Sequence, residues 1–163
     1  MKFLEKDLED IIWEADNEKL VDRGLLIGGK KFRQLRIGNY GVADLVTVEK
    51  CYEHFGNQPY LDITVFELKK EKAGISAFLQ AIRYCKGIST YLDNRNNDLL
   101  YKLHIVLCAK EIDTDSDYIF ITDLIQSEDY SYLNTVYNYS FTYSIDGIKF
   151  KREINYNLTN TGF

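Results

Sequence analysis

Several residue types that define common protein classes are scarce in this sequence. The 163 residues include one proline, two histidines and three cysteines, and no apolar run approaches the ~20 residues that a membrane span needs. The cysteines, at positions 51, 85 and 108, are far apart, so neither a disulfide framework nor a zinc cage is indicated. The first residues lack the apolar segment of a signal peptide, and we expect a cytoplasmic protein that does not enter a membrane.

An excess of basic residues is also missing. Twenty Lys and Arg against twenty-five Asp and Glu give a net charge of -5, which disfavours a protein that holds nucleic acid through bulk positive charge. Hydrophobic residues make up 45% of the chain and charged residues 28%, which is typical of a globular domain with its own core. No repeat or linker interrupts the sequence, so residues 1–163 are predicted to form a single domain.

The N-terminal two thirds predict an alternation of helices and strands. Apolar residues at helical spacing predict an amphipathic helix that ends before Gly24: Leu4, Leu8, Ile11, Ile12 and Ala15. Residues 31–37 and 42–48 predict a hairpin with its turn at 39–41. After a polar stretch, 49–59, a buried strand is expected at 60–69.

A second helical pattern covers residues 75–92, and the apolar run 103–109 predicts an interior strand. The predicted order is therefore α-β-β-β-α-β over about residues 3–109. Because a helix that crosses between two strands of one sheet makes them parallel, we expect an α/β fold with a mixed sheet.

The C-terminal part, about residues 117–157, predicts an antiparallel β-hairpin extension. Residues 118–122 are interpreted as a strand, 136–145 alternate strictly, and Asp146-Gly147 predicts the turn into a return strand at 148–156. One side of the alternating strand carries Tyr137, Tyr139, Phe141, Tyr143 and Ile145. This stripe is interpreted as core, with a platform for stacking bases as the alternative.

Acidic and basic side chains near two strand ends indicate chemistry. Glu67 and Lys69 lie two apart and share one face of a strand, and Asp44 belongs to the preceding strand. Carboxylates that gather beside a lysine are costly unless a charge compensates them. Mg²⁺ or Mn²⁺, held by carboxylates and a backbone carbonyl, is the natural compensation. Gln80 and Tyr84 stand four apart on the next helix and face the same way.

These residues resemble the motifs of the PD-(D/E)XK nuclease superfamily, in particular its small RecB-like and NucS-like members. The quoted elements are Glu5 (or Glu9) on the first helix, Gly41-Val42-Ala43-Asp44, Glu67-Leu68-Lys69, and Gln80 with Tyr84. The resemblance covers residues 5–109. It implies a restriction-endonuclease-like αβββαβ core and a nuclease that hydrolyses DNA, with RNA as an alternative substrate. Ala43 departs from the proline of the superfamily name.

Roles for individual residues follow from the resemblance alone. Asp44, Glu67 and the Leu68 carbonyl would hold Mg²⁺ or Mn²⁺, with Glu5 or Glu9 completing the site. Lys69 would orient or deprotonate the attacking water, and Gln80 and Tyr84 would support it. Basic residues on either side would approach the nucleic acid: Lys31, Arg33, Arg36, Lys70, Lys72 and Arg83.

Other interpretations remain open at this point. Each strand-end charge taken alone is typical of solvated surface, as are the lysines. The polar stretch 49–59 is either a substrate-contacting loop or a structural excursion. A non-catalytic nucleic-acid-binding or assembly module of the same fold is the alternative function. Tight sequence specificity would require a homodimer or a partner protein, because no separate recognition domain fits in the residues outside the predicted core.

Overall fold

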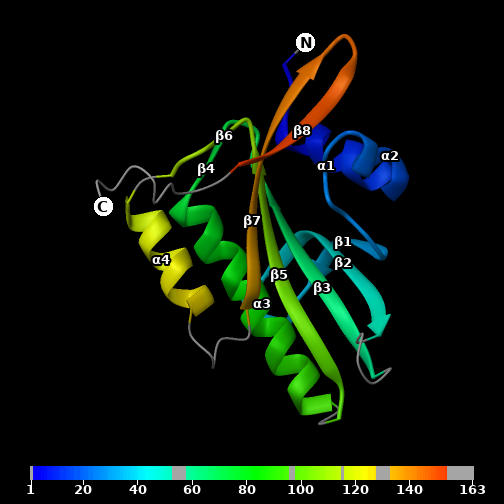
Figure 1. Cartoon of the computed structure of the whole chain (residues 1–163), viewed down its shortest axis with the longest axis vertical. Helices are drawn as coiled ribbons and strands as arrows, with labels where there is room; N and C mark the ends of the chain where they lie inside the picture. The colour runs from blue at the N-terminus through cyan, green and yellow to red at the C-terminus, as the bar shows by residue number, and fades with distance from the viewer. Residues whose placement is uncertain (1, 53–57, 96–97, 115, 128–132, 154–163) are drawn as a thin grey trace.

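A mixed six-stranded sheet forms the centre of the computed structural model, which describes residues 2–52, 58–95, 98–114, 116–127 and 133–153 (Figure 1). The strand order is β1-β2-β3-β5-β7-β8, and β3, β5 and β7 are parallel to one another while the other neighbours are antiparallel. These strands are β1 (Lys30–Arg36), β2 (Val42–Tyr52), β3 (Pro59–Leu68), β5 (Leu100–Ala109), β7 (Leu133–Ser144) and β8 (Gly147–Glu153). The predicted mixed sheet with a parallel pair is confirmed.

Helices cover both faces of this sheet. Helices α3 (Ile75–Arg95) and α4 (Ser116–Ser127) lie on one face, and α1 (Glu5–Glu14) and α2 (Asn17–Asp22) pack on the other (Figure 1). Each face has its own buried cluster, centred on Phe78 and Tyr84 on the α3 side and on Leu8 and Phe66 on the α1 side. A 3₁₀ turn, η1 (Gly38–Tyr40), joins β1 to β2, and β4 (Lys72–Ala73) pairs with β6 (Glu111–Ile112) as a small parallel ladder. Within the described ranges, no helix has the length and apolar character needed to cross a membrane.

The single N-terminal helix that we predicted is divided in two. The backbone is extended at Ala15 and Asp16, where α1 ends and α2 begins. The Lys31 ammonium donates to the carbonyls of Ile12 (3.0 Å) and Ala15, which α1 leaves without helical partners. The break is therefore stabilised by a cation at the C-terminal end of the helix dipole.

The hairpin of β2 and β3 is longer than its sequence indicates. Part of the predicted polar stretch 49–59 is strand, because the ladder extends from Leu45 opposite Phe66 to Tyr52 opposite Pro59. Alternation of exposed and buried positions near the end of β2 is weak, which is why the pattern did not reveal a strand there. Residues 53–57 of the predicted loop lie outside the described residues.

The strand predicted at 118–122 is wrong, because these residues belong to α4. Tyr118 and Thr122 are buried one helical turn apart. The Tyr118 ring packs edge-on against Phe78 of α3, with the ring centroids 6.0 Å apart. Its hydroxyl donates to Asn138 Oδ1 at 2.5 Å. The isoleucine-rich segment has strand propensity, but packing against α3 favours the helical period instead.

The C-terminal hairpin is confirmed, with its turn one residue earlier than predicted. Ser144 pairs with Gly147, so the turn residues are Ile145 and Asp146, and Gly147 has φ +95° at the start of β8. A type I turn followed by a left-handed glycine accounts for this geometry. Of the return strand predicted at 148–156, residues 154–156 lie outside the described part.

The aromatic stripe on β7 is core over its first half. Tyr139 and Phe141 are buried in the cluster on the α1 side, and Tyr137 packs against it. Tyr143 is 57% exposed, with its ring 4.9 Å from that of Phe3, and Ile145 is fully exposed in the turn. The buried rings have no face available to a base, which rules out the stacking platform there.

Candidate active site

The register of β2 and β3 brings Asp44 and Glu67 together. The ladder of these two strands ends where Leu45 pairs with Phe66, so Asp44 and Glu67 are the next residues of their strands beyond the last pair. The charge of Asp44 contributes to the raised pKa of Glu67. The two predicted carboxylates therefore share one end of the sheet.

Glu67 is the most unusual side chain of the site. It is 1% exposed, and neither carboxylate oxygen has a hydrogen-bond partner of good geometry among the described residues. Its one compensating contact is the Lys69 ammonium, which lies 3.0 Å from Oε1. Burial raises the pKa of Glu67 to about 7, the charges of Asp44 and Glu5 add to this rise, and Lys69 opposes it.

Lys69 is a cation in this setting. Burial alone would lower its pKa, but the contact with Glu67 and the charges of Glu5 and Asp44 raise it above the ordinary value of 10.5. An ammonium group with a raised pKa is a poor acceptor for the proton of an attacking water. Of the two roles that the resemblance implies for Lys69, the geometry favours charge stabilisation over deprotonation.

The two candidate glutamates of α1 have different partners. Glu5 Oε1 lies 3.9 Å from the Lys69 ammonium, and Glu5 Oε2 accepts the backbone N–H of Lys70 at 3.3 Å. Glu9 Oε1 accepts from Arg33 Nε at 2.5 Å, so its charge is already paired. Glu5 is therefore the helix carboxylate that faces the Glu67–Lys69 pair.

Gln34 connects Glu9 to Asp44, a link that the sequence did not reveal. Its Nε2 donates to Glu9 Oε1 at 3.1 Å and to Asp44 Oδ1 at 3.3 Å. Gln34 has φ +50° in the middle of β1, a conformation that no sequence pattern signals for glutamine. Burial and the charge of Glu9 raise the pKa of Asp44, while the Gln34 hydrogen bond and Lys69 lower it.

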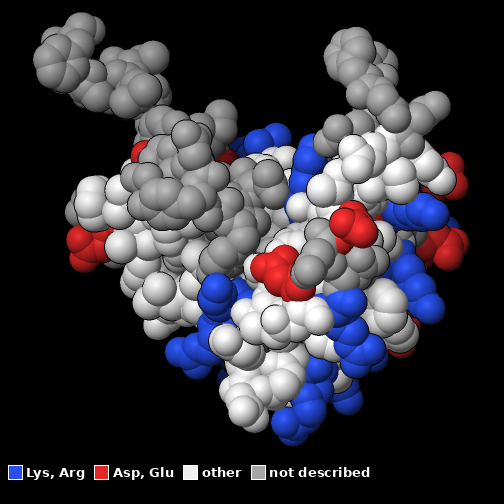
Figure 2. Space-filling model, turned by 90° about the horizontal axis from the view of Figure 1, so that it is seen from below, with Lys and Arg blue, Asp and Glu red and all other residues white. Residues whose placement is uncertain are grey.

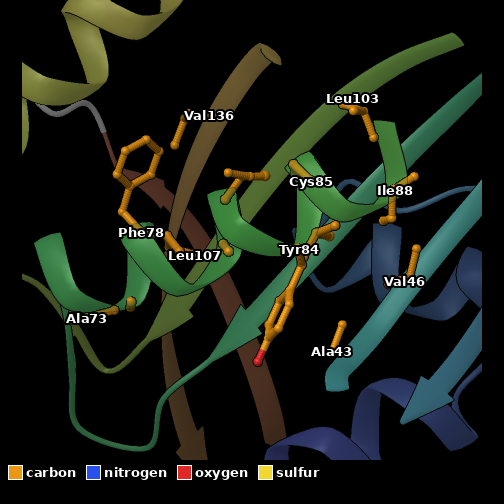
Figure 3. Close-up of a cluster of buried hydrophobic side chains, with 14 of the residues drawn as sticks. Ala43, Val46, Ala73, Phe78, Tyr84, Cys85, Ile88, Leu103, Leu107 and Val136 are labelled. Atoms are coloured by element: carbon orange, nitrogen blue, oxygen red, sulfur yellow. The ribbon is translucent and has the colours of Figure 1, made fainter. Parts of the chain in front are cut away.

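Gln80 and Tyr84 support the backbone before Asp44. Gln80 Nε2 donates to the Tyr84 hydroxyl at 2.9 Å, and the Tyr84 ring lies close enough to Gly41 that a Cβ there would be 3.0 Å from it. The hydroxyl points toward the end of β2 that carries Ala43 (Figure 3). Among the described contacts, none joins either side chain to Glu67 or Lys69. Their position fits support of the strand rather than contact with a phosphate.

Three of the six basic residues predicted to bind nucleic acid are engaged within the protein. Lys31 binds the end of α1, Arg33 pairs with Glu9 and Asp10, and the Lys72 ammonium lies 3.6 Å from Asp113. Arg36 and Arg83 are exposed, and Lys70 is partly exposed. Counting basic residues in the sequence therefore overestimated the positive surface beside the site.

The donor set fits a magnesium-type site of few protein ligands and does not form a metal cage. Within the described residues, no three His, Cys, Asp or Glu side chains are gathered so that they could hold a metal ion. Mg²⁺, however, is commonly held by one or two carboxylates together with water and substrate phosphate. Asp44 and Glu67 supply two, and the unpartnered Glu67 oxygens are the kind of group that a divalent cation would satisfy.

Comparisons with known proteins give no further information on function. No protein-family model, curated protein or solved structure shows a significant match to this chain. The functional proposal therefore rests on the residues and their geometry, together with the motif resemblance.

Proposed function

We propose that this protein is a Mg²⁺- or Mn²⁺-dependent nuclease that hydrolyses phosphodiester bonds of DNA. The observation that carries the proposal is Glu67: a carboxylate at 1% exposure, with a pKa that the charge of Asp44 helps to raise, oxygens that lack hydrogen bonds and a lysine cation 3.0 Å away. A buried acid of this kind destabilises a fold, and such groups concentrate at functional sites.

Each side chain has a distinct role in this proposal. Asp44, Glu67 and the Leu68 carbonyl would hold the cation, which when bound lowers the pKa of water and stabilises charge on phosphate. Lys69 places a fixed positive charge beside the scissile phosphate. Glu5 positions Lys69 through its carboxylate at 3.9 Å and holds the following backbone through the N–H of Lys70.

The order of elements also supports the proposal. From α1 through β1, β2, β3 and α3 to β5, the chain follows the α-β-β-β-α-β order that the resemblance implies, and β3 and β5 are parallel. Asp44 lies near the start of β2 and Glu67 near the end of β3, so in this antiparallel pair both lie at the same end of the sheet.

The test is DNA cleavage by the purified protein with Mn²⁺ or Mg²⁺, using supercoiled plasmid and end-labelled duplex, single-stranded DNA and RNA. Glu67→Gln and Lys69→Met are expected to lower the rate by at least about 100- to 1000-fold, because each removes a charge that acts on the reacting phosphate. Glu71→Gln and Lys149→Met are the matched controls, since they change the same residue types at exposed positions outside the site. Cleavage that persists in both site variants would contradict the proposal.

A non-catalytic nucleic-acid-binding or assembly module is the second candidate. It is favoured by the ion pair itself, because the Lys69 ammonium already lies where a metal would approach Glu67. Calorimetric titration with Mg²⁺ and Mn²⁺ separates the two functions. A nuclease site predicts saturable binding that Asp44→Asn removes, whereas a module predicts no such binding.

A further inference from the structure

A groove of about 700 Å³ lies between the sheet face of β1–β3 and the C-terminal half of α3, outside the candidate active site. Its base is apolar strand surface, including Val46, Val48 and Ile63, and Ile88 and Leu92 of α3 form the opposite wall. The turn Gly38–Tyr40 forms part of its rim. A volume of this size is typical of sites for small organic ligands or for parts of larger ones.

Aromatic rings and small polar groups line the groove together. Phe32, Tyr40 and Tyr91 come from three different elements, and Tyr91 is 54% exposed. Asn39 and Thr90 add polar side chains to this lining. Flat rings beside hydrogen-bonding groups suit a nucleobase, which has a π-face and a polar edge. A purely aliphatic ligand would make no use of them.

Positive charge surrounds this lining, and acidic residues are absent from it. Arg36 is the one charged residue among the lining side chains. The Lys30 ammonium lies 5.1 Å from the centre of the Phe32 ring, and the Arg95 guanidinium lies 4.8 Å from that of Tyr91. Figure 2 shows Lys and Arg side chains at the end of the molecule where α3 finishes, with a smaller number of Asp and Glu side chains among them. For a chain of net charge -5, this is a local surface suited to phosphates.

We propose that this groove binds unpaired nucleotides of single-stranded DNA, with a base in the apolar groove and the flanking phosphates on Arg36, Lys30 and Arg95. The inference rests on the proposed function, and it names single-stranded DNA as the preferred substrate form. The groove and the site lie on one segment of chain, since Asp44 follows the rim residue Tyr40 by four positions. The turn that lines the groove therefore leads directly into the strand that carries Asp44.

The experiment measures fluorescence anisotropy of a labelled ten-residue oligothymidine in EDTA, so that binding is separated from cleavage. Tyr91→Ala and Arg36→Gln are each expected to weaken binding about tenfold, since loss of a stacking ring or of a phosphate contact has an effect of this order. Phe120→Ala and Lys149→Gln are the matched controls, because both residues are exposed and lie outside the groove lining. Circular dichroism of each variant establishes that it is folded.

A second comparison uses an abasic oligonucleotide of the same length and a blunt duplex. The wild-type protein is expected to bind the oligothymidine at least about tenfold more tightly than the abasic strand, because only the former offers bases to stack. Equal affinity for the two, or unchanged affinity in the Tyr91→Ala and Arg36→Gln variants, would overturn the groove assignment while leaving metal-dependent cleavage intact. Groove-dependent binding without cleavage in Mn²⁺ would instead overturn the proposed function.

Discussion

The candidate active site and the groove differ in the charges that their side chains carry. At the site, Glu5 and Glu67 lie 3.9 Å and 3.0 Å from the Lys69 ammonium, the charge of Asp44 acts on the same lysine, and burial raises the pKa of Glu67 to about 7. In the groove, apolar and aromatic surface is left open, and its one charged lining residue is Arg36. The site alone would repel a polyanion, whereas the groove attracts one. An acidic protein can thus divide affinity and chemistry between two surfaces.

The largest expected effect on stability comes from the buried charge of Glu67 at the candidate active site. Since the pKa of Glu67 is raised from 4.5 to about 7, the folded state keeps a proton there that the unfolded chain loses between these pH values. Stability therefore falls as pH rises from about 4.5 to 7, by at most on the order of 3 kcal/mol. Glu67→Gln removes this dependence, so the variant should be more stable than the wild type at pH 8 and similar to it at pH 4.

Urea denaturation at a series of pH values measures the effect, with exposed Glu71→Gln as the control. A Glu67→Gln variant that is less stable than the wild type at pH 8 would show that the ion pair with Lys69 outweighs the cost of burial. In that case the site would be a structural salt bridge, and its contrast with the groove would disappear.

The next effect concerns the packing that shapes the groove. A Cβ at Gly87 would lie 2.5 Å from Ile37 Cγ2 and 2.8 Å from the Tyr40 ring, so Gly87→Ala forces the η1 turn away from α3. Overpacking of this kind costs about 1–3 kcal/mol. We expect lower stability in urea and weaker oligothymidine binding, because Tyr40 lines the groove. Leu79→Ala, at a 49% exposed position of the same helix, is the control. Unchanged oligothymidine binding by Gly87→Ala would show that the position of the turn does not affect the groove.

The smallest expected effect concerns the hydrogen bond between Gln80 and Tyr84, on the helix that also lines the groove. Tyr84→Phe removes the acceptor of the Gln80 hydrogen bond and keeps the ring that packs beside Gly41. We expect a loss of about 0.5–1.5 kcal/mol in unfolding free energy. The cleavage rate should fall far less than in Lys69→Met. A rate loss equal to that of Lys69→Met would place the hydroxyl among the reacting groups, and Tyr143→Phe at an exposed position is the control.

Hydrophobic periodicity predicted most of the secondary structure correctly. Helix α3 and strands β3 and β5 each have a long pattern with one period, and their positions were predicted to within a few residues. Spacing along one strand also predicted that Glu67 and Lys69 would share a face, and they form an ion pair at 3.0 Å. The link to Asp44 came from the motif resemblance. The strand prediction for residues 118–122 was wrong because an isoleucine-rich segment fits both the helical and the strand period. The contact of Tyr118 with Phe78 favours the helix.

The sequence did not predict which side chains contact one another across the fold. Lys31 and Arg33 look like surface charge in a linear reading, yet one binds the end of α1 and the other pairs with Glu9 and Asp10. Gln34 gave no signal, because its position depends on a left-handed backbone within a strand. Local patterns encode which face a residue occupies, whereas these contacts join residues that lie 10 to 25 positions apart.

The placement of α1 also has a consequence for the role of the C-terminal hairpin. Leu8 and Ile12 of this helix share a buried cluster with Phe141 and Phe150 of the last two described strands, and Phe150 N–H donates to the Arg23 carbonyl at 2.8 Å. The cluster on which the helix carrying Glu5 packs is therefore complete only when β7 and β8 are in the sheet. A chain without these two strands would lack part of that surface, so the C-terminal hairpin contributes to holding Glu5 beside Lys69.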